Sequence, residues 1–335
     1  MAARLPAGFF GVTPQAPLGA GDLAKMGRLG LTLRIPVYWF QVEPEREKYD
    51  FSSLDRTVGE AAAAGVPVLP FVCGSPDWLT GDPAVPPLAG ARARAWSVLL
   101  RRLVDRYGPH GSFWVGRAER QPIRRWQIWN EPNFKLFWHP RPSPPAYVGL
   151  LRRSARVIRR ADPAAEVVAA GLAPVEGGLY PWEFLRRMYR VPGAARAFDL
   201  AALHPYATSL GALEYELRAV RRVMARADDG SKPLLVTEIG VASAGAFRNP
   251  FDKGPRGQAR FLAGAYRLML ENRRRWRLAG AYWFTWEDGT TPDSHCVFCE
   301  FAGLFDSAGR PKPAWWALRR TVASATGRGS ASLDP

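Results

Sequence analysis

Three features are scarce in this chain of 335 residues, and each scarcity weakens one class of protein. The three cysteines, Cys73, Cys296 and Cys299, are too few for a disulfide scaffold. The four histidines stand in neither HxH nor HExxH spacing, which argues against a metal-dependent hydrolase. Runs of about 18 apolar residues are missing, so we expect no membrane span.

The N-terminal stretch MAARLPAGFFGVTPQ has no long apolar core, so it is unlike a secretory signal. We therefore expect a cytoplasmic protein, or a secreted one whose signal has been removed. Cys296 and Cys299 form a single CxxC, which suits a local disulfide or reduced thiols. A zinc site would need further ligands, for which only His295 and the distant Cys73 are at hand, so we favour the first two interpretations.

Lysine is also rare, with six residues against 40 arginines, yet the net charge is +16. Such a charge can serve a nucleic acid, an anionic polymer or a membrane surface. The alternative is a surface composition in which arginines are scattered over outer helix faces. The arginine clusters fall in expected helices, and no basic arm or RNA-binding motif is present, so we favour the alternative and expect no nucleic acid partner.

Short apolar segments alternate with longer amphipathic ones along the whole chain. Apolar stretches such as VPVLPFV are typical of strands buried on both faces of a parallel sheet. We expect strands at 9–13, 31–37, 66–72, 125–130, 166–170, 200–204, 234–238 and 280–285. We expect helices at 22–29, 53–64, 91–107, 145–162, 181–189, 210–227, 256–276 and 313–325.

This alternation predicts an α/β fold, a closed (β/α)8 TIM barrel. A doubly wound sheet is the alternative, but no GxGxxG follows the first expected strand. Residues 1–325 would form one catalytic barrel without an accessory β-sandwich, and residues 326–335 a flexible tail. We expect a monomer.

Polar and aromatic side chains follow several of the expected strands. In a TIM barrel the active site lies where the strands end, so these side chains should converge. Glu131 directly follows the fourth strand, and Glu238 ends the seventh. Two carboxyl groups surrounded by aromatic rings suit glycoside hydrolysis, in which one carboxyl protonates the leaving oxygen and the other attacks or activates water.

The motifs IWNEPN at 128–133 and LLVTEIG at 234–240 resemble the two catalytic motifs of clan A glycoside hydrolases, the retaining (β/α)8 glycosidases. The motifs SPDW and HPYA make family 39-like or family 5-like members the nearest resemblance. Family 39 enzymes generally carry an extra β-sandwich, for which this chain has no segment. The resemblance covers residues ~10–325.

The resemblance implies a role for each matching residue. Glu131 would be the general acid/base and Glu238 the nucleophile, with Asn130 binding the 2-hydroxyl of the sugar. Arg34 would hold Glu238 ionised and Tyr206 would hydrogen-bond it. Further substrate contacts would come from His204, from Trp286 as the floor of the sugar subsite, and from Trp39, Trp78 and Glu287.

The resemblance thus predicts a retaining glycosidase without metal or organic cofactor that acts on an oligo- or polysaccharide. The apolar side chain of Trp129 would help to keep Glu131 protonated. If the charge of +16 serves a partner at all, an anionic polysaccharide is the substrate that it suits. Two alternatives are a carbohydrate-binding barrel without catalysis and a transglycosylase that uses the same residues.

Overall fold

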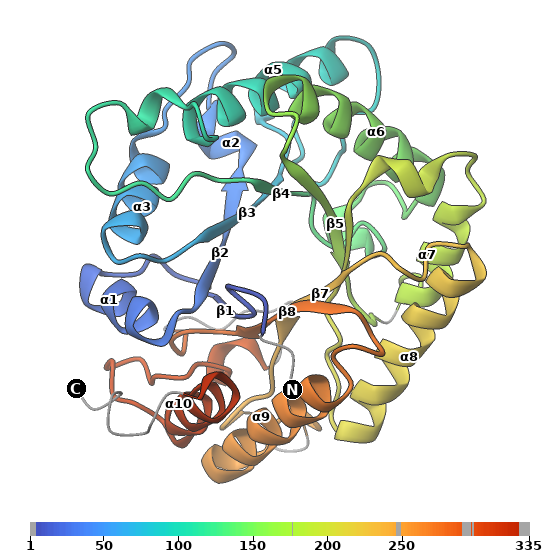
Figure 1. Ribbon diagram of the computed structural model, residues 1–335. Helices are drawn as coiled ribbons and strands as arrows, with labels where there is room; N and C mark the ends of the chain where they lie inside the picture. Colours follow the sequence, from blue (N-terminus) through green and yellow to red (C-terminus); the bar gives the residue numbers. More distant parts are fainter. Residues whose placement is uncertain (1–4, 176, 246–248, 290–295, 297, 328–335) are drawn as a thin grey trace.

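The computed structural model describes residues 5–175, 177–245, 249–289, 296 and 298–327. Eight parallel strands form a closed barrel in chain order, with β1 paired to β8 (Figure 1). The strands are β1 (Phe10–Thr13), β2 (Thr32–Tyr38), β3 (Val68–Cys73), β4 (Arg125–Ile128), β5 (Glu166–Leu172), β6 (Leu200–Leu203), β7 (Leu234–Ile239) and β8 (Leu278–Phe284). The predicted TIM barrel is therefore confirmed.

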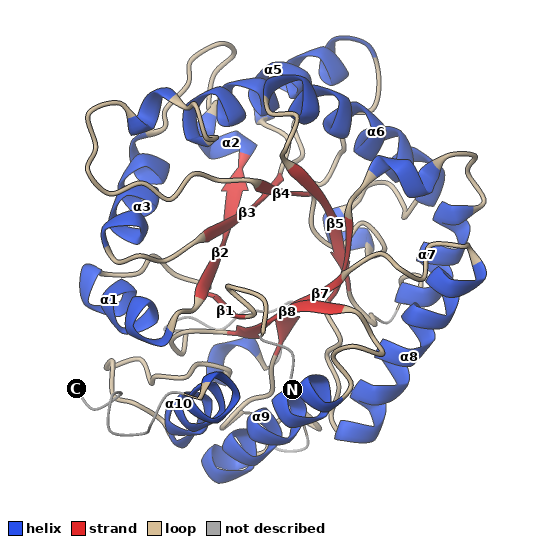
Figure 2. Cartoon of the chain, in the orientation of Figure 1, coloured by secondary structure: helices blue, strands red, loops and turns tan. Residues whose placement is uncertain are grey.

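A ring of helices surrounds the barrel (Figure 2). The long helices are α1 (Ala20–Leu29), α3 (Ser52–Ala63), α5 (Gly90–Tyr107), α6 (Pro144–Ala161), α7 (Pro181–Tyr189), α8 (Leu210–Arg226), α9 (Gly254–Glu271) and α10 (Pro313–Thr326). All eight were expected from the apolar pattern. Of the expected tail 326–335, Thr326 still belongs to α10, and residues 328–335 lie outside the described residues.

Local sequence signals set several helix ends. Ser143 precedes Pro144, the first residue of α6, and its side chain accepts a hydrogen bond from the Ala146 amide. Gly30 ends α1 in the left-handed conformation, at φ 66°. Two short helices were not expected, α2 (Trp39–Val42) and α4 (Asp77–Thr80), because one turn is too short to produce a periodic pattern. None of the described helices combines the length and the apolar character that crossing a bilayer requires.

The barrel interior changes from apolar to polar along its axis. A small cluster fills one level and includes Leu69, Leu200, Leu235 and Tyr282. Tyr282 occupies space beside Gly11, where any Cβ would meet its ring at 1.6 Å. Charged and amide side chains lie in the barrel beyond this cluster, so the interior is a packed core that leads to a polar mouth.

Aromatic rings fill the layer between the barrel and helices α5 and α6. Trp96 of α5 lies 5.5 Å from Trp39 and 6.0 Å from Trp129, measured between ring centroids. Trp129 in turn packs against Trp138, and Trp138 against Tyr147 of α6. The side chains of all five residues are almost completely buried, so these four tryptophans belong to the hydrophobic core.

Replacing Trp96 with alanine should lower the free energy of unfolding by about 3–5 kcal/mol, because it leaves a cavity between the rings of Trp39 and Trp129. The change also removes the hydrogen bond from the Trp96 indole to Ser154. Chemical denaturation followed by circular dichroism measures the loss. Trp316→Ala is the matched control, since Trp316 is 41% exposed and its removal should change stability by about 0.5 kcal/mol or less. Equal losses in the two variants would contradict the packing role of Trp96.

Candidate active site

The segment after β4 carries Glu131 in an unusual backbone conformation. Trp129 and Glu131 both have positive φ angles, 70° and 40°, which residues other than glycine rarely adopt. Two hydrogen bonds hold this conformation: the Trp129 amide donates to the Val72 carbonyl, and the Glu131 amide donates to the Gly171 carbonyl. Neighbouring strands β3 and β5 thus keep the strained turn in place, as is typical of functional sites.

Glu238 lies in β7 and has a cationic and a neutral hydrogen-bond donor. The Arg34 guanidinium donates to its Oε1 at 2.6 Å, and the Tyr206 hydroxyl donates to its Oε2. Glu238 is 7% exposed and Arg34 is fully buried, so the ion pair is shielded from solvent. Both contacts were expected from the sequence.

Arg34 also organises the neighbouring strand. Its Nη2 donates to Asn130 Oδ1 at 3.1 Å and its Nε donates to Gln127 Oε1 at 2.7 Å. Gln127 in turn donates to the Ala169 carbonyl of β5. Gln127 was not predicted from the sequence, although a single amide in the buried strand RWQI is a signal that it faces a polar partner inside the barrel.

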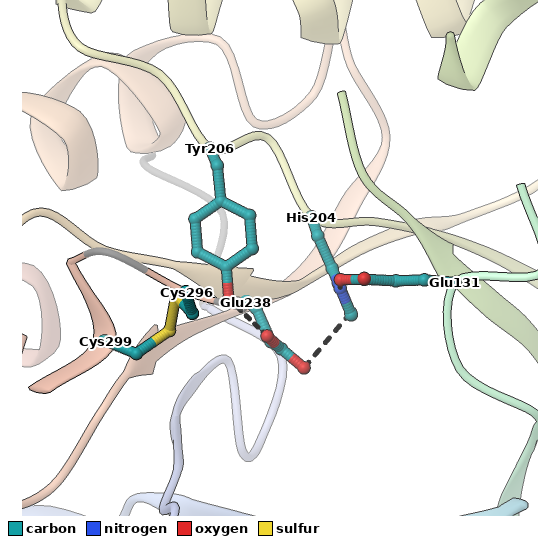
Figure 3. Close-up of a disulfide and its surroundings, with 6 residues drawn as sticks. All are labelled: Glu131, His204, Tyr206, Glu238, Cys296 and Cys299. Atoms are coloured by element: carbon teal, nitrogen blue, oxygen red, sulfur yellow. Dashed lines mark hydrogen bonds and ion pairs between the residues drawn. A yellow bond between two sulfur atoms is a disulfide. The ribbon is translucent and has the colours of Figure 1, made fainter. Parts of the chain in front are cut away.

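His204 lies between the two carboxyl groups (Figure 3). Its Nδ1 is 2.7 Å from Glu131 Oε1, and its Nε2 is 3.5 Å from Glu238 Oε1. The ring is fully buried, and it uses space that exists because residue 171 is glycine. A Cβ on Gly171 would lie 1.9 Å from His204 Nε2.

The two carboxyl groups are close together. One oxygen of each, with a ring nitrogen of His204, forms a group in which all three atoms lie within 4.8 Å of one another. Two carboxylates and an imidazole at this spacing could coordinate a cation. In this site, however, Arg34 and Tyr206 already donate to the oxygens of Glu238, and His204 contacts Glu131. Donors of the protein thus stabilise the negative charge that a cation would otherwise neutralise.

The surroundings shift the pKa values of the two carboxyl groups in opposite directions. Burial raises the pKa of Glu131, and the hydrogen bond and charge of His204 only partly oppose this shift. Burial would also raise the pKa of Glu238, but His204, Arg34 and the Tyr206 hydrogen bond together lower it below its usual value. Relative to a free carboxyl group, the site therefore favours the protonated form of Glu131 and the ionised form of Glu238.

An apolar wall with a disulfide stands beside Glu238. The Tyr206 ring contacts Phe298 edge-on at 5.1 Å between centroids, and Phe298 stacks on Phe251 at 4.6 Å. Phe298 lies between Cys296 and Cys299, which form a disulfide, so the local-disulfide interpretation of the CxxC is confirmed. Figure 3 shows this bridge on the Tyr206 side of the site.

The tryptophans expected around the sugar are placed differently. Trp39 and Trp286 are 0% and 1% exposed. Trp39 donates its indole N–H to Glu43, and Trp286 packs between Phe305 and Trp315. Neither ring therefore has a free face for a sugar, whereas Phe284 of β8 contacts Tyr206, at 6.1 Å between ring centroids.

Three further expectations have mixed outcomes. Trp78 is half-buried and donates to the Glu43 carbonyl, which leaves part of its ring accessible. Glu287 is half-buried, and the charges that act on it come from Asp22, Asp306, Asp288 and Lys25, so it belongs to the α1 side of the rim. Trp129 packs outward against the helices rather than beside the Glu131 carboxyl, so the expected apolar shield is not this ring.

No protein-family model matches this sequence, and no curated protein matches it either. Solved structures do. A GH5_18 variant from Bifidobacterium longum subsp. longum has 17% identity and a TM-score of 0.69, over 95% of this chain and 78% of the other. A GH39 enzyme from Xanthomonas axonopodis pv. citri has 19% identity and a TM-score of 0.66, over 94% and 67%.

Xylanase 10B from Thermotoga maritima has 15% identity and a TM-score of 0.65, over 96% of this chain and 95% of the xylanase. Further structural neighbours are described as a glucosidase, a β-xylosidase and a mannosidase. The structural neighbours are thus glycoside hydrolases, GH39 and GH5 enzymes among them, as the resemblance of the two motifs suggested. At these identities the likeness shows a shared barrel fold.

Gly171→Ala should move the His204 ring and weaken its hydrogen bond to Glu131. We expect the variant to lose about 1–3 kcal/mol of stability through overpacking. We also expect the pKa of Glu131 to rise further, since the His204 hydrogen bond lowers it. Thermal unfolding and a carboxyl NMR titration measure the two effects.

Gly149→Ala is the matched control for this change. A Cβ at Gly149, on the exposed face of α6, meets no atom within 4 Å, so this variant should be slightly more stable than the wild type. A Gly171→Ala protein with unchanged stability and an unchanged Glu131 titration would contradict the proposed contact.

Proposed function

We propose that this chain is a retaining glycoside hydrolase that cleaves O-glycosidic bonds of an oligo- or polysaccharide by double displacement. The observation that carries the proposal is the pair Glu131 and Glu238, whose oxygens lie within 4.8 Å and whose pKa values shift apart. Carboxyl groups about 5–5.5 Å apart are typical of retention, whereas inversion needs ~6.5–9.5 Å to admit a water.

In the first step, Glu238 attacks the anomeric carbon while the protonated Glu131 gives its proton to the leaving oxygen. The C–O bond to the leaving group breaks and a glycosyl ester of Glu238 forms. In the second step, the ionised Glu131 takes a proton from water, the water oxygen attacks the anomeric carbon, and Glu238 is released. Two displacements restore the original anomeric configuration.

The described side chains suit these steps. Arg34 and Tyr206 hold Glu238 in one orientation and ionised, as a nucleophile requires. Burial raises the pKa of Glu131, which favours the protonated form that a general acid requires. Asn130 is fixed by Arg34 through its Oδ1, which leaves its amide N–H groups to donate to a sugar hydroxyl. The names of the structural neighbours, among them a xylanase and a mannosidase, support a saccharide substrate.

Glu238→Ala should reduce the hydrolysis of an activated aryl glycoside by several orders of magnitude, because no nucleophile remains. Azide should restore part of the turnover and give a glycosyl azide of inverted configuration, since one displacement then replaces two. Product analysis by NMR gives the configuration. Glu119→Ala, which removes an exposed loop carboxyl, should retain wild-type activity. Full residual activity in Glu238→Ala would overturn the assignment, and a wild type that binds glycans without cleaving any would favour a binding protein.

The pH dependence of kcat/KM should be bell-shaped. Activity should rise with pH as Glu238 ionises, at a pKa below the usual carboxyl value, and fall as Glu131 loses its proton, at a raised pKa. Tyr206→Phe removes a hydrogen bond that favours the ionised form of Glu238, so the acidic limb should move to higher pH while the alkaline limb stays.

The control for the pH profile is Tyr189→Phe. Tyr189 donates its hydroxyl to Asp229, away from the site, so this variant should leave both limbs in place. A Tyr206→Phe profile that moves only on the alkaline side would contradict the assignment of the two carboxyl groups.

A further inference from the structure

An exposed aromatic cluster lies on the outside of the barrel, at the start of α7 and α8. Tyr180 stacks on Trp182 with ring centroids 4.9 Å apart and ring planes 4° from parallel. Tyr215 meets the same Trp182 edge-on at 5.5 Å and 88°. Trp182 is half-buried and supports both tyrosines, which are 57% and 55% exposed. Contiguous exposed aromatic rings suit a binding surface, because tyrosine and tryptophan combine an apolar face with a polar edge.

Basic side chains continue this cluster along α8. Tyr215, Arg218 and Arg222 are three and four residues apart, so they lie on one face of the helix. With Gly211 and Glu214 they line a surface hollow of ≈ 260 Å³. Glu214 pairs with Arg218 at 3.4 Å, and Arg222 has no ion pair within the described part of the chain. We call Tyr180, Trp182, Tyr215, Arg218 and Arg222 the aromatic–arginine platform.

The platform is connected to the segment that carries Glu131. The Asn133 amide, two residues beyond Glu131, donates to the carbonyls of Ala173 and Leu179 at 2.7 Å each. The Leu179 amide donates back to the Asn133 carbonyl, and Tyr180 follows directly. Because helix N-termini of a TIM barrel lie on the side where strands end, Tyr180 and the start of α8 lie toward the rim of the mouth. Arg218 and Arg222 continue from there along α8 toward its C-terminal end.

We propose that the aromatic–arginine platform binds a distal part of an anionic polysaccharide whose scissile bond lies at Glu131 and Glu238. This inference rests on the proposed function and names its substrate class. The tyrosine faces suit the apolar faces of sugar rings, and the guanidinium groups suit uronate or sulfate groups. The net charge of +16 attracts such a chain as a whole.

A single-stranded nucleic acid is the other polymer that stacks on aromatic rings and pairs with arginine. The glycan is favoured because the platform is joined through Asn133 to a mouth that holds two carboxyl groups. Carboxylates at that point would repel a phosphate backbone, whereas a glycan can bring its neutral glycosidic oxygen to them and its charged groups to the arginines.

Binding of the Glu238→Ala chain to polygalacturonate should weaken by at least about tenfold when Tyr180 and Tyr215 both become alanine. Arg222→Ala should weaken it by about two- to fivefold and reduce its dependence on salt. Titration calorimetry at two salt concentrations measures both effects. Trp316→Ala and Arg94→Ala are the matched exposed controls, on α10 and α5, and should bind as the parent does.

Hydrolysis separates this proposal from the proposed function. In the chain with an intact Glu238, the tyrosine substitutions should raise KM for the polymer and leave turnover of a short aryl glycoside unchanged. If the wild type did not turn over any aryl glycoside, the proposed function would be contradicted. The binding proposal would still stand, because binding is measured independently of cleavage.

Three results would overturn the proposal that the platform binds an anionic polysaccharide. The first is equal, salt-insensitive binding of neutral xylan or mannan, which would exclude an anionic class. The second is tighter binding of single-stranded DNA that the same substitutions abolish. The third is polygalacturonate binding that is undetectable in the parent or unchanged by the tyrosine substitutions.

Discussion

The buried guanidinium of Arg34 is the interaction on which the site depends. Its three nitrogens contact Glu238, Asn130 and Gln127, so one side chain from β2 fixes groups on β4 and β7. A buried cation is unfavourable unless it is paired, and here a carboxylate and two amide oxygens compensate it. Its guanidinium carbon also lies 4.0 Å from the centroid of the Phe71 ring. The charge of Glu238 and the geometry of Asn130 are therefore parts of one network.

His204 joins this network to Glu131 and explains why two nearby acids differ. Like charges at this spacing oppose joint ionisation, and the donors are distributed unequally. Glu238 has Arg34 and Tyr206, whereas Glu131 has His204 and a buried environment. The difference between the pKa values of Glu131 and Glu238 thus follows from which strands carry the hydrogen-bond donors.

The barrel and the two glutamates were predictable because both leave local signals. Apolar stretches mark the buried strands, and a carboxylate that ends such a stretch must face a polar opening. The direction of a tryptophan leaves no such signal: Trp39, Trp129 and Trp286 follow strands as site residues do, yet all three pack against helices. The positive φ at Trp129 changes the alternation of side chains at the strand end. Tyr180 and Tyr215 are 35 positions apart in the chain, and only the fold brings both of them against Trp182.

The bridge between Cys296 and Cys299 closes a very short loop, and a loop of this size removes little conformational freedom from the unfolded chain. Its contribution to global stability is accordingly small, and its effect is local. The bridge constrains Phe298, and Phe298 supports the Tyr206 ring that donates to Glu238. The bridge therefore matters for the position of one ring beside Glu238 rather than for the persistence of the barrel.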